Sequence, residues 1–353
     1  MEIIAGLIQG GDCMQQELNL YRDKNRNECD ESWIFTDRIW SVGEVIRYIR
    51  EEQEISIYQL ANGICSVPTL SRIEAGDRDP DLITMEVLLS RLGYQPQKFE
   101  MIGSPKEFEQ YEARSGMRTC AREHQAQQLR AMLDDYIKKL VKGKRREISL
   151  EEDPLHWQFV REMEGYLLLD EGRIQEGLAL LEEAIACTLP QWQKSWYNRF
   201  VASSGELKLL HYISVIYESQ GEKNRAYEIR HGIWNYLNQK RFHRDQIPQL
   251  YTEITCELVP YLLEQRSSAK EGLYLCNVAL KSLSDTNCLY NWCDLLYWKG
   301  RCIEALADKG EATEEEAVGV YQRAYYIYRL MNKEAEAQKL KRYLKERYGW
   351  ESI

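Results

Sequence analysis

Hydrophobic residues recur with helical spacing along most of the chain from residue 42 onward. One early segment places four apolar residues at i, i+3, i+4 and i+7, the spacing of one buried helix face: Ile57, Leu60, Ala61 and Ile64. The pattern breaks at Gly63, and a second short helix is predicted after Ser66, a good N-cap, with Pro68 in its first turn. Three apolar residues form its predicted buried side: Val67, Leu70 and Ile73. The two segments predict a helix-turn-helix.

The outward face of the second predicted helix carries small donors and one guanidinium: Ser66, Thr69, Ser71 and Arg72. Such groups suit base edges and phosphates when a helix lies in a major groove. An apolar stripe at 42–49 precedes the motif, and another at 82–92, closed by Gly93 as a C-cap, follows the turn at 76–80. We therefore expect a head of four or five short helices over residues 41–100.

The signature Ser71-Arg72-Ile73-Glu74-x-Gly76, followed by Pro80, resembles the Xre/lambda-repressor-like helix-turn-helix family over about residues 42 to 95. Glu74 lies fourteen residues after Leu60, one fewer than in the commoner family pattern. This shortened turn looks like the PlcR/RRNPP group of peptide-sensing, quorum-sensing transcription factors. The resemblance implies a homodimer on operator DNA. We expect DNA contacts from eight residues: Gln59, Ser66, Val67, Pro68, Thr69, Ser71, Arg72 and Arg78.

Charge favours a second interpretation of the head. Residues 41–100 hold ten acidic and six basic side chains, a net charge of −4, whereas DNA-binding domains are typically basic. A repeat scaffold whose head contacts a protein partner is therefore the alternative hypothesis. Arg72 and Glu74 have an alternative role too, pairing inside the head. A local basic rim remains available from five cations: Arg47, Arg50, Arg72, Arg78 and Lys98.

From about Pro105 the chain reads as consecutive amphipathic helices. Residues 165–190 fit the slots of the tetratricopeptide consensus, a helix-turn-helix repeat of about 34 residues. Partial units follow with wider spacing, which predicts longer helices or loops, and Arg230 fits its slot poorly. Six further segments complete the predicted pattern: helices at 105–124 and 125–142, units near 214–233, 272–279 and 317–324, and a capping helix at 333–348. The predicted fold is all-α, with about five helix pairs plus a cap in a right-handed TPR-like α-solenoid.

Such a solenoid has a concave surface, which the first helix of each pair is expected to line. Mixed polar and aromatic residues suit a short signalling peptide whose backbone amides need partners. The repeat alignment predicts six peptide-binding residues on this surface: Glu162, Tyr166, Lys208, His211, Glu257 and Tyr261. The chain has 23 tyrosines, and the alternative for any of them is packing in the core.

Composition narrows the function classes. The 353 residues carry a net charge of −10, which disfavours sequence-blind coating of nucleic acid. The ten cysteines form no CxxC pair, and the spacing of Cys288, Cys293 and Cys302 fits no standard zinc pattern. The sequence has no Walker A loop, HExxH or G-x-S-x-G motif and no apolar run long enough to span a membrane. We expect a cytoplasmic regulator that is not an enzyme, with no metal and no cofactor.

The expected domain order is an unassigned extension at 1–40, the head at 41–100, a linker at 101–106 and the repeats at 107–353. A basic run from Lys138 to Arg146 closes an amphipathic helix, where cations favour the C-terminal end of the helix dipole. Contact with the DNA backbone is its alternative role.

Overall fold

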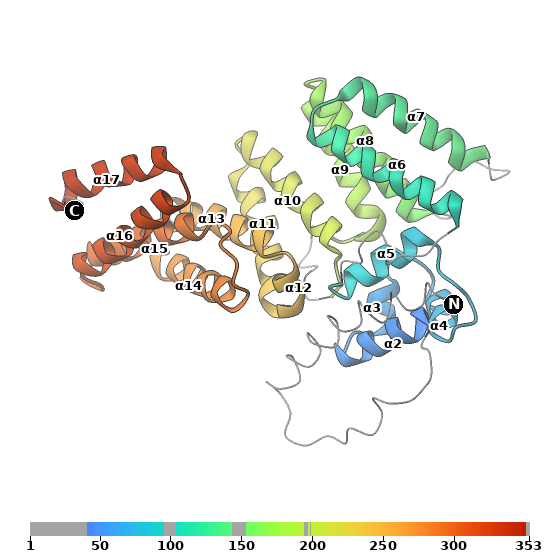
Figure 1. Ribbon diagram of the computed structural model, residues 1–353, viewed down its shortest axis with the longest axis horizontal. Helices are drawn as coiled ribbons and strands as arrows, with labels where there is room; N and C mark the ends of the chain where they lie inside the picture. Colours follow the sequence, from blue (N-terminus) through green and yellow to red (C-terminus); the bar gives the residue numbers. More distant parts are fainter. Residues whose placement is uncertain (1–40, 95–103, 143–152, 194–196, 198, 351–353) are drawn as a thin grey trace, which may run out of the picture.

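The computed structural model describes residues 41–94, 104–142, 153–193, 197 and 199–350, and the regular elements in these ranges are helices (Figure 1). Four short helices form the head, defined here as residues 41–94: α2 (Val42–Glu52), α3 (Ile57–Ala61), α4 (Val67–Glu74) and α5 (Leu82–Arg91). Each begins after an N-cap whose side chain accepts a backbone N–H: Ser41, Ser56, Ser66 and Asp81. The predicted head helices are therefore confirmed.

The rest of the described chain forms the repeat region, residues 104–350. Its helices are α6 (Pro105–Arg122), α7 (Ala126–Lys142), α8 (Pro154–Asp170), α9 (Ile174–Thr188), α10 (Ser204–Ser219), α11 (Lys223–Gln239), α12 (Arg241–Gln246), α13 (Pro248–Gln265), α14 (Ala269–Asp285), α15 (Trp292–Ala307), α16 (Glu314–Leu330) and α17 (Glu334–Tyr348). Among the described residues they make five antiparallel pairs and the capping helix α17, as predicted. The short α12 and the segment between α9 and α10 account for the wide spacing of the units.

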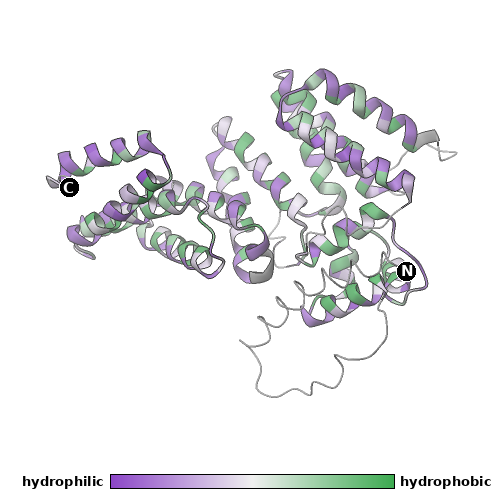
Figure 2. Cartoon of the chain, viewed as in Figure 1, coloured by the Kyte–Doolittle hydropathy of each residue, from purple (hydrophilic) through white to green (hydrophobic). Residues whose placement is uncertain are grey.

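Apolar faces of neighbouring helices meet throughout the repeat region, while polar residues lie on the outer faces (Figure 2). Helices α8 and α9 pack closely because both carry glycine where they cross. A Cβ at Gly165 would lie 3.1 Å from the Gly177 carbonyl oxygen and 2.7 Å from a methyl of Leu181, so side chains there would force the helices apart. Continuous packing of this kind supports the predicted helical-repeat architecture.

Arg230 fits its repeat slot poorly because it serves an ion network inside the region. Its side chain is buried, and its guanidinium contacts the Glu257 carboxylate at 2.8 Å, the Glu218 carboxylate at 2.6 Å and the Ser214 hydroxyl at 3.1 Å. A buried charge is tolerated when paired and hydrogen-bonded in this way.

Several expectations fall outside the described residues. These are the extension at 1–40, Lys98 of the basic rim, the first half of the linker at 101–106, and residues 143–146 of the basic run. No helix in the described part of the chain is long and apolar enough to cross a membrane.

Candidate functional site

The α3–turn–α4 unit has the geometry that the sequence predicts. The Ser66 hydroxyl caps α4 by accepting from the Thr69 N–H at 3.3 Å, and the two hydroxyls lie 2.9 Å apart. Leu70 and Ile73 are buried against the head core. The opposite face of α4 therefore remains available to a partner.

The eight predicted DNA-contacting residues divide by exposure. Five are exposed, namely Ser66, Pro68, Ser71, Arg72 and Arg78, and Val67 and Thr69 are half-buried on the same segment. Gln59 is different, because its side chain is already occupied. Its carbonyl oxygen accepts the Ser56 N–H at 2.9 Å, and its amide donates to the Arg199 carbonyl of the repeat region at 3.5 Å.

Glu74 holds the head together rather than facing a partner. The Arg50 guanidinium donates to both of its carboxylate oxygens, at 2.7 and 2.8 Å, which ties α2 to the end of α4. Arg50 thus turns inward and leaves the predicted basic rim, while Arg47 pairs with Glu51 at 2.9 Å. Arg72 and Arg78 are exposed and have no ion pair among the described residues. The exposed face of α4 and the turn after it therefore carry little unpaired positive charge.

Tyr58 is an exposed residue that the sequence reasoning missed. Its side chain is 72% exposed on α3, next to the buried Leu60 and Ala61. An aromatic residue on the polar face of a short amphipathic helix was the available signal. It provides an exposed phenolic hydroxyl and ring on the first helix of the helix-turn-helix unit.

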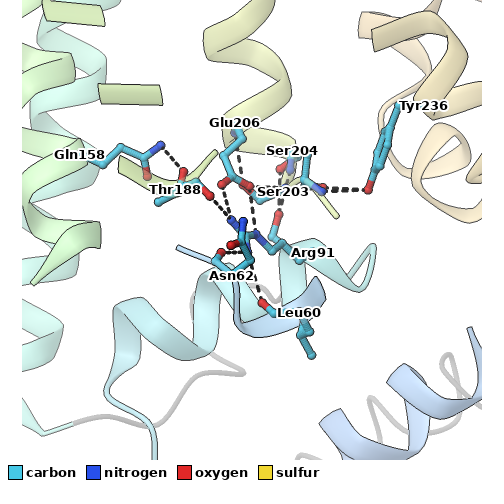
Figure 3. Close-up of polar contacts among 11 residues, drawn as sticks. Leu60, Asn62, Arg91, Gln158, Thr188, Ser203, Ser204, Glu206 and Tyr236 are labelled. Atoms are coloured by element: carbon cyan, nitrogen blue, oxygen red, sulfur yellow. Dashed lines mark hydrogen bonds and ion pairs between the residues drawn. The ribbon is translucent and has the colours of Figure 1, made fainter. Parts of the chain in front are cut away.

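The head is fixed to the repeat region through a buried ion pair. Arg91, at the end of α5, is fully buried, and its guanidinium contacts the Glu206 carboxylate of α10 at 2.7 and 3.3 Å (Figure 3). It also donates to the backbone carbonyls of Leu60 and Thr188 at 3.2 Å, and to that of Asn62. One side chain therefore joins α3, α5, α9 and α10.

The Glu206 carboxylate remains charged in this buried position. Burial alone raises its pKa, but Arg91 and the Ser203 N–H, which donates to Glu206 at 2.6 Å, stabilise the charged form and lower the pKa overall. Ser203 also caps α10 by accepting the Glu206 N–H. The capping box of α10 and the head–repeat contact thus share one carboxylate.

Close backbone packing completes this junction. Gly63 has a positive φ of 68°, and a Cβ there would lie 2.3 Å from the Thr188 carbonyl oxygen. Ser90 of α5 accepts the Ser204 N–H of α10 at 3.0 Å. Leu155 and Val201 of the repeat region belong to the hydrophobic core of the head. Head and repeats therefore share a core as well as a polar contact.

A cleft of about 530 Å³ separates the start of α4 from the start of α8. Three predicted DNA-contacting residues, Ser66, Thr69 and Arg78, line one wall, and residues 153–156 line the other. Ser71 and Arg72 do not line this cleft. Some of the predicted DNA-contacting residues thus face the repeat region, and others lie outside the cleft.

A larger cavity of about 690 Å³ lies where α5, α6, α8 and α10 meet. Three of the predicted peptide-binding residues line it, namely Glu162, Tyr166 and Lys208. The Tyr166 hydroxyl donates to Glu162 at 3.0 Å, and the ring of Tyr166 meets that of Tyr212 edge-on at 5.2 Å. Burial raises the pKa of Glu162, partly offset by Arg118 and by this hydrogen bond.

The other three predicted residues lie in the next part of the repeat region. The His211 Nε2 atom lies 2.8 Å from the Glu257 carboxylate, which also binds Arg230. Tyr261 stacks on Tyr227 at 4.5 Å and donates to the Asn224 side chain. The structure thus places the six residues in two groups, one around the cavity and one in an internal polar and aromatic network.

Among the described residues no group of three or more His, Cys, Asp or Glu side chains has an arrangement that would hold a metal ion. The cysteines in this part of the chain are free thiols. Burial raises the pKa of Cys187 to about 11, which disfavours the reactive thiolate.

Comparison with known proteins identifies the head. Residues 46–99 match the family model described as helix-turn-helix. The chain therefore carries a helix-turn-helix domain, followed by helical repeats. No curated protein matches the chain.

Three solved structures are similar to the chain. One is Bacillus thuringiensis PlcR in complex with the peptide PapR7 and DNA, with 17% identity, 85% of this chain and 98% of that chain covered, and a TM-score of 0.42. Another is the apo form of the competence regulator ComR from Streptococcus vestibularis, with 16% identity, 86% of this chain and 97% of that chain covered, and a TM-score of 0.39. Kinesin light chain TPR-like repeats from Podosopora anserina are similar at 15% identity, with 62% of this chain and 93% of that chain covered and a TM-score of 0.42.

Proposed function

We propose that the protein is a transcription regulator that binds operator DNA as a dimer and is controlled by a short peptide bound by its helical repeats. The observation that carries this proposal is the exposed face of α4. Ser66, Ser71 and Arg72 present hydroxyl and guanidinium donors on the second helix of a helix-turn-helix unit. This is the position from which such units contact base edges.

The charge of the head supports the proposed dimer. Each exposed cation that meets a phosphate releases counterions and adds affinity, and Arg72 and Arg78 are the two exposed arginines of this segment without an ion pair among the described residues. A single head with so few phosphate contacts would bind weakly. Two heads on two half-sites double these contacts and restore a specific affinity.

Control by a peptide is supported by the position of the cavity next to the head. A ligand changes DNA affinity only when it binds one orientation of the head more tightly than another. Because the head is joined to the repeats by Arg91 and by a shared core, a change in the repeats has a physical route to α4. Such a change would alter the cleft between α4 and α8, which three of the predicted DNA-contacting residues line.

The test is a selection of genomic DNA fragments by the full-length protein, with and without a pool of random heptapeptides. We expect enrichment of a sequence with two related half-sites, binding that weakens steeply as salt rises, and an enrichment that changes with the pool. No enriched DNA under either condition would overturn the proposal.

The acidic balance of the head supports one competing function, a scaffold whose head contacts a protein. In that case Tyr58 and α4 form a protein-binding surface, and DNA recovered in the selection would show no sequence preference. The same experiment therefore separates the two functions.

A further inference from the structure

The cavity at the head–repeat junction is built from both parts of the protein. Glu86, Val87 and Ser90 of the head line it from α5, while α6, α8 and α10 supply the remaining walls. Ser90 accepts the Ser204 N–H, and Glu206, another lining residue, binds Arg91. An occupant of this cavity would therefore touch the head and the repeats at once.

Two of the three acidic side chains that line the cavity are paired with arginines. Glu206 is paired with Arg91, and Glu86 with Arg114 at 3.2 Å and Arg118 at 3.9 Å. Glu162 accepts the Tyr166 hydroxyl and lies in an environment that disfavours its charged form. The two paired acids therefore repel an anion less than free carboxylates would.

Two of the four basic side chains that line the cavity have no ion pair among the described residues. Lys208 of α10 and Arg122 of α6 are exposed, and neither has an ion pair among the described residues. The other two, Arg118 and His124, contact Glu86 at 3.9 Å and Asp170 at 2.7 Å. The cavity thus offers two cations without an ion pair from two different helices, α6 and α10, which is an arrangement suited to a carboxylate.

The size of the cavity limits what it can hold. About 690 Å³ is within the range of small-molecule sites and admits only a few residues of a peptide. The Tyr166–Tyr212 pair supplies an aromatic wall that links α8 to α10. A short segment with a carboxylate and an apolar side chain matches both features.

We infer that this cavity binds a carboxylate-bearing segment of a short peptide, with Lys208 and Arg122 on the carboxylate and the head helix α5 forming part of the seat. The inference rests on the proposed peptide control and assigns it a location and a chemistry. A ligand held between α5 and α10 stabilises the joined position of the head.

The test uses the full-length protein and three random heptapeptide pools: one with a free C-terminal carboxylate and no acidic residues, one amidated without acidic residues, and one amidated with acidic residues. Retained peptides are identified by mass spectrometry after gel filtration, and their affinities are then measured by calorimetry. We expect retention from the first or third pool, which tells a terminal carboxylate from a side-chain carboxylate. Equal retention from the second pool would overturn the inference.

Variants then locate the site. Lys208→Gln is expected to weaken binding of a retained peptide about tenfold, because a charge-assisted hydrogen bond is lost. Arg122→Gln is expected to weaken it by a similar factor for the same reason. Lys281→Gln, an exposed lysine on α14 away from the cavity, is the matched control. The retained peptide should also slow hydrogen exchange in α5.

The outcomes separate this inference from the proposed function. Peptides that bind equally to wild type and Lys208→Gln would overturn the cavity assignment and leave peptide control at another site standing. Failure to retain any peptide would overturn both the inference and the peptide control, while the DNA selection decides independently about the head.

Discussion

Removing one partner of the Arg91–Glu206 ion pair is expected to release the head from the repeat region. Both side chains are buried, and the guanidinium and carboxylate are in direct contact at 2.7 Å. Two charges about 4 Å apart at an effective dielectric constant of about 20 attract each other by ~4 kcal/mol. Because the remaining charge stays buried without a partner, Glu206→Gln should cost about 3–5 kcal/mol of head-docking free energy.

A double-mutant cycle with Arg91→Met isolates the pair itself. Arg91→Met also removes donors to three backbone carbonyls, so its cost alone overstates the ion pair. We expect a coupling free energy of about 2–4 kcal/mol between the two substitutions. The assay is native-state hydrogen exchange in α3 and α5, which reports the local opening of the head. Glu264→Gln, an exposed carboxylate on α13, is the control.

The pair also predicts that the free energy of head docking falls at acidic pH. The pKa of Glu206 is lowered in the folded protein from its ordinary value of 4.5, so the stabilisation is present above pH 4.5 and is lost as the pH falls through the folded value. Wild-type head exchange should therefore accelerate at acidic pH more steeply than that of Glu206→Gln. A coupling below about 0.5 kcal/mol, together with equal acid sensitivity, would refute the role of this pair.

Further predictions concern the junction and the capping helix. Gly172→Ala should lower the free energy of unfolding by about 1 kcal/mol, because Gly172 has a positive φ. Gly63→Ala should lower it by more, because Gly63 has a positive φ and also packs against the repeats. Equal urea midpoints for the two variants would contradict this contact. Glu304→Gln should lower the free energy of unfolding by about 1–3 kcal/mol and speed hydrogen exchange in α17, because the Glu304 carboxylate accepts hydrogen bonds from Tyr321, Tyr343 and Tyr348. The control Glu346→Gln should leave hydrogen exchange in α17 unchanged.

Local chemistry made much of the fold predictable. The N-cap at Ser66, the C-cap at Gly93 and the apolar stripes of the repeats are signals within one or two helical turns. They were sufficient for the head helices, the five helix pairs and α17. The tetratricopeptide spacing covers residues 165–190, and the structure adds that Gly165 and Gly177 lie at a close helix crossing.

Contacts between distant segments were not predictable in the same way. Arg91 and Glu206 are 115 positions apart, and neither residue type nor spacing indicates the pairing. Arg50 was assigned to the basic rim because a sequence does not reveal that Glu74 turns toward it. Likewise, Glu162, Tyr166 and Lys208 share a cavity, but the contribution of α5 to that cavity depends on how the head is docked. The role of the eight DNA-contacting and six peptide-binding residues stays a prediction.

The sequence preference of a Thr69→Ala, Ser71→Ala variant tests the central claim most directly. The claim is that α4 reads base edges, so the variant should bind the selected DNA with a flattened preference across the half-sites and an unchanged salt dependence. Thr119→Ala, on α6, is the control and should keep the wild-type preference. An identical preference profile for the variant and wild type would contradict the account.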